Sequence, residues 1–130
     1  MMRGKIACTC MRVALGMVFL LFGIGKFKND VWAQTIKNTD FFLKLPWDAT
    51  ISVFLIGASE IITGIALIVG ICTRFFAGVA SLQLAGILLL LRFEETRDIG
   101  LLGAAIYLAA VKNESYGIDL FLSKKKRRME

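Results

Sequence analysis

Four long apolar runs dominate this chain of 130 residues, and they restrict its fold more than any other feature. A helix needs about 20 mostly apolar residues to cross ~30 Å of hydrocarbon, and three of the runs approach that length. The fourth run is short, so we expect it to recruit polar residues at its ends. The runs also lack the alternation of polar and apolar residues that is typical of a membrane β-barrel. The predicted spans cover about residues 8–27, 50–71, 75–91 and 97–112.

The composition agrees with a membrane protein, because 57% of the residues are hydrophobic and the mean hydropathy is +0.70, more than a soluble domain of this length carries. The sequence therefore predicts an all-α integral membrane protein with a single four-helix bundle over residues 1–123. An interfacial loop at 28–49 joins the first two spans, and a basic tail occupies 124–130. The aromatic residues of the loop predict a short surface helix from Val31 to Leu43.

The distribution of lysine and arginine predicts the orientation of the bundle. With four spans, the two termini and the turn at residues 72–74 share one side, which is strongly basic. The positive-inside rule then places both termini in the cytoplasm, as expected for a prokaryotic plasma (inner) membrane protein. The net charge of +6 indicates contact with anionic lipid rather than nucleic acid. Residues 124–128, all basic, are expected to bind lipid headgroups.

Apart from charged residues at the ends of the runs, two charged residues lie inside them, Arg12 in the first and Glu60 in the second. A charge at bilayer depth is costly unless it faces protein or water, so both are candidate functional residues. A rise of 1.5 Å per residue places Arg12 about 6 Å and Glu60 about 16 Å from the cytoplasmic ends of their spans. Since both side chains are long, the geometry allows an Arg12–Glu60 ion pair. Gln83 and Tyr107 lie at compatible depths and complete the candidate intramembrane polar site.

Small residues indicate that these polar groups point into helix contacts rather than into lipid. Each charged residue shares its helical face with two glycines: Gly16 and Gly23 with Arg12, Gly57 and Gly64 with Glu60. Three roles are open for the polar site: an internal staple between helices, a pocket for a small polar headgroup such as that of a quinone, or a proton relay. A hydrated Glu60 would favour transport, a lipid-accessible crevice would favour quinone binding, and a dry, closed pair would favour the structural role.

Cysteine and histidine usage restricts the chemistry further. Cys8, Cys10 and Cys72 are all expected on the cytoplasmic side, so no reactive pair is predicted on the outer face for thiol exchange with exported proteins. The chain contains no histidine, which excludes bis-histidine haem ligation. No metal site and no intrinsic cofactor are predicted.

Four segments resemble, in order, the sequence pattern of DoxX-type membrane proteins. Residues 12–27 carry an arginine, a glycine, and then G-x-G-K with an apolar residue, and residues 45–46 form the Leu-Pro step of the outer loop. Residues 60–74 carry E-x-x-x-G followed by G-x-x-T-R. Residues 114–119 are similar to the family's small, aromatic, then aspartate element, with glycine in place of the usual serine. The resemblance covers nearly the whole chain.

The resemblance implies a four-helix membrane bundle linked to redox chemistry, because DoxD relatives are associated with thiosulfate:quinone oxidoreductase as a membrane subunit. It directs attention to five positions: Arg12, Lys26, Glu60, Arg74 and Asp119. We therefore expect an accessory or quinone-contacting membrane subunit of an oxidoreductase, with a soluble redox enzyme as partner and a homo-oligomer as a further option. Whether the chain is itself catalytic is left open. The alternatives are a small-molecule transporter, or a membrane chaperone or assembly factor with a purely structural Arg12–Glu60 pair.

Overall fold

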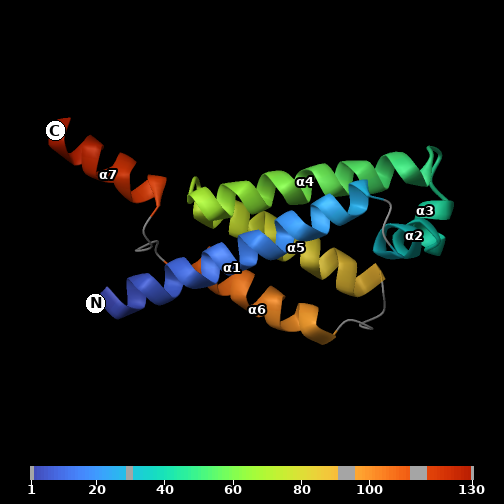
Figure 1. Cartoon of the computed structure of the whole chain (residues 1–130), viewed down its shortest axis with the longest axis horizontal. Helices are drawn as coiled ribbons and strands as arrows, with labels where there is room; N and C mark the ends of the chain where they lie inside the picture. The colour runs from blue at the N-terminus through green and yellow to red at the C-terminus, as the bar shows by residue number, and fades with distance from the viewer. Residues whose placement is uncertain (1, 29–30, 91–95, 112–116, 130) are drawn as a thin grey trace.

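The computed structural model describes residues 2–28, 31–90, 96–111 and 117–129 (Figure 1). Its secondary structure is helical, and no strand occurs in these ranges, so the predicted all-α class is confirmed. The helices are α1 (Met2–Phe27), α2 (Val31–Lys37), α3 (Asp40–Leu43), α4 (Ala49–Val69), α5 (Thr73–Leu90), α6 (Thr96–Ala110) and α7 (Ile118–Met129).

The four longest of the first six helices, α1, α4, α5 and α6, lie side by side (Figure 1). Helix α1 packs mainly against α4, and α5 packs mainly against α6. Both chain termini and the α4–α5 turn lie at one end, here called the terminal end, while α2 and α3 lie at the opposite end (Figure 1). Helices α1, α4 and α5 are long and apolar enough to cross a membrane, whereas the apolar part of α6, Asp98–Ala110, is shorter. The part of the chain that the structure describes therefore contains three candidate spans, and the fourth remains a prediction.

Large and small apolar side chains alternate in the core between the long helices. Leu15 and Phe19 of α1 and Leu67 of α4 meet small residues of α5 and α6, and each of these side chains is almost fully buried. Small residues allow the helix backbones to approach closely, which favours dispersion contacts in a membrane where lipid offers no hydrophobic driving force. The buried residues of this core are Leu15, Phe19, Leu67, Ala77, Ala80, Leu84, Ala105 and Leu108.

The segment between α1 and α4 forms a cap at the α2–α3 end. Ile36 and Phe42 pack against Val53 in a second apolar cluster. The single surface helix predicted here is two short helices, because the chain leaves the helical conformation at Thr39, which is extended with φ −72° and ψ 134°. The cap therefore buries part of its apolar surface against α4 instead of lying wholly on a membrane surface.

Gly70 is the C-cap residue of α4, at the turn between α4 and α5. Gly70 adopts a left-handed conformation with φ 79°, and the N–H groups of Gly70 and Ile71 both donate to the carbonyl of Ala66. A residue with a side chain is strained in this conformation, so glycine ends α4 here and allows α5 to begin at Thr73.

Candidate functional site

Two glycine pairs set the register of α1 against α4. A Cβ atom at Gly16 would lie 2.8 Å from the carbonyl oxygen of Gly64, and a Cβ atom at Gly23 would lie 2.7 Å from that of Gly57. Such distances are too short for real contacts, so the two backbones touch at these points only because both helices carry glycine. The glycines are seven residues apart on each helix, and this equal spacing allows both pairs to meet in the antiparallel arrangement.

This register brings Lys26 to Glu60. The Lys26 Nζ lies 2.7 Å from Oε1 and 2.5 Å from Oε2 of Glu60, so both carboxylate oxygens accept from the ammonium. Lys26 is 6% exposed and Glu60 is 1% exposed. Side chains on a helix lean toward its N-terminus, so in antiparallel helices Lys26 leans inward from the end of α1 while Glu60 leans outward along α4. The two charged groups therefore converge from different depths.

The Arg12–Glu60 pair that the depth estimate allowed does not form, because the Arg12 guanidinium lies at the terminal end and Glu60 binds Lys26. It fills the space that a Cβ atom would need at Gly70 and at Gly117. Gly70 follows Glu60 by ten residues, which is about 15 Å along a helix. The depth estimate failed because it measured each span from the cytoplasmic end of its apolar run, whereas close glycine contacts decide how far one helix slides along the other.

Asp119 forms a second polar cluster around the α4–α5 turn. Its carboxylate accepts from the backbone N–H of Cys72 at 2.8 Å and of Thr73 at 2.9 Å, and its own N–H donates to the Gly70 carbonyl at 3.1 Å. An acidic side chain that binds free N–H groups at a helix start acts as an N-cap, and here the cap of α5 comes from a distant segment. We call Arg12, Gly70, Cys72, Thr73, Gly117 and Asp119 the Asp119 cluster.

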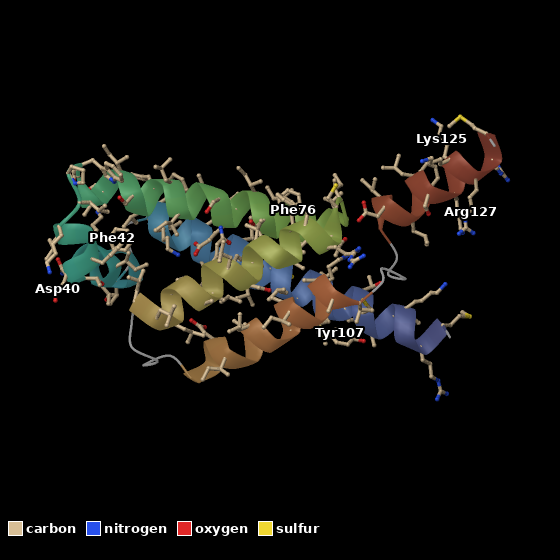
Figure 2. The ribbon with its side chains drawn as sticks, turned by 180° about the vertical axis from the view of Figure 1, so that it is seen from behind. Asp40, Phe42, Phe76, Tyr107, Lys125 and Arg127 are labelled. Atoms are coloured by element: carbon tan, nitrogen blue, oxygen red, sulfur yellow. The ribbon has the colours of Figure 1, made fainter. Side chains whose placement is uncertain are left out.

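The remaining predicted site residues make other contacts than the ion pair. Gln83 Nε2 donates to Ser59 Oγ at 2.8 Å and so links α5 to α4. Tyr107 is 50% exposed on α6 (Figure 2). The Arg74 Nε donates to the carbonyl of Ala109 at 3.2 Å, at the C-terminal end of α6, where a cation is favourable. The structure thus divides the predicted polar site among several helix contacts.

Hollows in the described surface lie away from these polar residues. One between α1 and α6 is lined by Val18, Leu21, Phe22 and Leu101, and another lies beneath the α2–α3 cap. Neither is lined by Lys26 or Glu60. Within the described ranges, no three Cys, Asp or Glu side chains lie close enough together to hold a metal ion. The ion pair is closed to solvent, because both side chains are buried between the helices.

Two interaction partners were not predicted from the sequence: Lys26 as the counter-ion of Glu60, and Asp119 as the cap of α5. Lys26 and Asp119 entered only as motif positions, although Lys26 follows Gly23 by one helical turn and so shares its face. The equal spacing of the two glycine pairs was the signal that could have fixed the register. Asp98, buried in the first turn of α6, was expected only as a flanking residue of the fourth span.

Comparison with protein families identifies the chain. The family model for DoxX matches residues 7–92, which is more than half of the sequence. The chain belongs to the DoxX family. The matched region of this DoxX protein contains Arg12, Lys26, Glu60 and Arg74, while Asp119 lies beyond it. Comparisons with curated proteins and with solved structures give no significant match.

Proposed function

We propose that this DoxX protein is a non-catalytic membrane subunit of an oxidoreductase system, which holds a soluble redox enzyme at the membrane. The observation that carries the proposal is the closed Lys26–Glu60 pair: its charges satisfy each other, and neither the α1–α6 hollow nor the hollow beneath the cap is lined by either residue. A group that must bind substrate or transfer protons needs access, whereas a staple between helices does not. The link to redox chemistry comes from the family resemblance.

The polar residues do not fit a quinone. A quinone needs hydrogen-bond donors at its carbonyl oxygens beside an apolar groove, yet Arg12, Glu60 and Gln83 bind at three different helix contacts. The α1–α6 hollow is lined by apolar side chains alone. We therefore assign the Lys26–Glu60 pair a structural role rather than a role in quinone binding.

A transporter is less well supported by the same geometry. Transport through Glu60 would require a water path that reaches its carboxylate from both sides of the membrane. Glu60 is instead 1% exposed and bound at both oxygens by Lys26. An assembly factor remains compatible with the closed pair, and it differs from the proposed subunit in the partner that it holds.

The proposed topology has four spans and both termini in the cytoplasm of a prokaryotic cell. The common position of the two termini in Figure 1 supports an even number of spans. The short α6 would cross with polar residues at its ends and a locally thinned bilayer. Five basic residues in α7 support a cytoplasmic terminal end. The soluble partner would then bind at that end.

The proposal is tested by photo-crosslinking in the native membrane. A photoreactive residue replaces the exposed Ile6 at the terminal end, and a matched variant carries it at the exposed Phe41 in α3. We expect a soluble oxidoreductase subunit to be captured from position 6 and not from position 41. Recovery of no redox protein from position 6, or equal recovery from both positions, would overturn the proposal.

A ligand test accompanies the crosslinking. The melting temperature of the purified protein is measured with and without a quinone analogue and thiosulfate, for wild type and Glu60→Gln. We expect neither compound to shift it. A rise that vanishes in Glu60→Gln would place a ligand site at Glu60 and contradict the structural role.

A further inference from the structure

Helix α7 extends away from the other helices (Figure 1). It exposes apolar and basic side chains together. Phe121 is 72% exposed and Leu122 is 55% exposed, and no residue of α7 is buried. Ile118, Phe121, Leu122 and Met129 follow the helical spacing that places them on one face. A soluble helix would cover such a face against its own core, so this face requires a different environment.

The charge of α7 is strongly positive along its second half. Residues 124–128 are consecutive lysines and arginines, and all are exposed, as Lys125 and Arg127 illustrate in Figure 2. Asp119 is the only acidic residue among positions 118–129, and its oxygens accept from the N–H groups of Cys72 and Thr73. Its carboxylate is thus held one to two helical turns before the basic run. The basic run is therefore free of a neighbouring acid on α7 and can attract a partner of negative charge.

The Asp119 cluster fixes where α7 begins. It ties the first turn of α7 to the turn between α4 and α5, which are two of the candidate membrane spans. The end of a span marks the boundary of the hydrocarbon, so Phe121 and Leu122 lie within about one helical turn of that boundary. The basic residues follow at the level of the headgroups.

We propose that α7 is an interfacial helix that binds the surface of an anionic phospholipid bilayer. Ile118, Phe121 and Leu122 enter the boundary between headgroups and acyl chains, and the basic residues bind lipid phosphates. The apolar face beside the positive charge favours a bilayer over a nucleic acid, and the tie to two membrane spans favours a bilayer over an acidic protein. Arg12, packed between Gly70 and Gly117, supports this attachment from α1. The inference is independent of the proposed redox role.

The test uses the full chain in nanodiscs made of phosphatidylcholine alone or of phosphatidylcholine with phosphatidylglycerol. Amide hydrogen exchange of α7 is followed by mass spectrometry, because insertion into the interface slows the opening of helical amides. We expect exchange across 118–125 to be at least about tenfold slower in the discs with phosphatidylglycerol. High salt should reduce this protection, because salt screens exposed charges beyond a Debye length of ~8 Å or less.

Variants separate charge from apolar contact and from folding. Lys124→Gln with Lys125→Gln should lose most of the protection, while the matched control Arg3→Gln with Lys5→Gln removes two charges from α1 and should retain it. Phe121→Ser with Leu122→Ser should also lose it, and the melting temperature of every variant should stay near that of wild type. Equal exchange in both kinds of disc, or full protection in the Lys124 and Lys125 variant, would overturn the proposal.

Discussion

The Lys26 ammonium binds both carboxylate oxygens of Glu60 across the contact between α1 and α4, at 2.7 and 2.5 Å. Lys26 lies in the last turn of α1, whereas Glu60 lies in the middle of α4. The ion pair therefore connects the end of one helix to the middle of the other. The register that allows this meeting is the same one that the glycine pairs set. Charge pairing and backbone contact therefore specify one arrangement of the two helices.

Breaking this pair should destabilise the protein strongly. Glu60→Gln or Lys26→Met leaves a buried charge without its counter-ion, and we expect either change to lower the free energy of unfolding by about 3–5 kcal/mol. The double change Lys26→Leu with Glu60→Leu should recover most of the loss. Reversible denaturation in detergent micelles measures the free energy of unfolding of the wild type, the two single variants and the double variant.

The matched control for this series is Arg12→Leu with Glu60→Leu. It should not recover stability, because Arg12 lies at Gly70 rather than at Glu60. Recovery in this control, with none in the Lys26 and Glu60 double variant, would assign the counter-ion of Glu60 to Arg12 instead.

Filling the glycine contacts should separate α1 from α4. A Cβ atom at Gly23 would lie 2.7 Å from the Gly57 carbonyl oxygen, so we expect Gly23→Ala to cost about 1–3 kcal/mol through overpacking. Gly78→Ala is the control, since nothing lies within 4 Å of a Cβ atom there. The control should be neutral or stabilising, because alanine favours helix more than glycine does. The denaturation midpoints of the two variants measure this difference. An equal loss of stability in both variants would contradict a close backbone contact at Gly23.

Removing the Asp119 carboxylate should loosen the start of α5. Asp119→Ala leaves the N–H groups of Cys72 and Thr73 without their acceptors, and loss of an N-cap costs about 0.5–2 kcal/mol. We expect faster amide exchange at these two residues and unchanged exchange in the middle of α5. Unchanged exchange at Thr73 would show that the cap contributes nothing to the stability of α5.

The start of α4 should respond to acid through Asp48. The N–H of Thr50 donates to its carboxylate at 3.0 Å, and this backbone hydrogen bond, the largest cause, lowers the pKa of Asp48 below its ordinary value. Because the pKa is lower in the folded state, the stabilisation is present above the unfolded-state pKa of about 3.9 and is lost as the pH falls through the folded-state value.

The difference in melting temperature between wild type and Asp48→Asn should therefore shrink as the pH falls from about 6 to about 3. Asp40→Asn, at an exposed acidic residue in the first turn of α3, serves as the control. A constant difference between wild type and Asp48→Asn across this range would rule out the Asp48 carboxylate as its source.

The helices, the membrane class and the need of Glu60 for a polar partner could be predicted from the sequence alone. Long apolar runs specify helices because a backbone in hydrocarbon must satisfy its hydrogen bonds within its own segment. An acidic residue inside such a run must have a partner, whatever the fold. The helix faces that carry glycine could also be predicted, because the helical period depends only on spacing along the sequence.

Which residues meet depends on how the helices pack. The partner of Glu60 depends on how far α1 slides along α4, and close backbone contacts at Gly16 and Gly23 settle that distance. Asp119 binds N–H groups that lie 46 and 47 residues earlier in the chain, a relationship that no local pattern specifies. Helix formation is governed by neighbours in sequence, whereas ion pairs and caps between helices are governed by register, which exists only after the helices have packed.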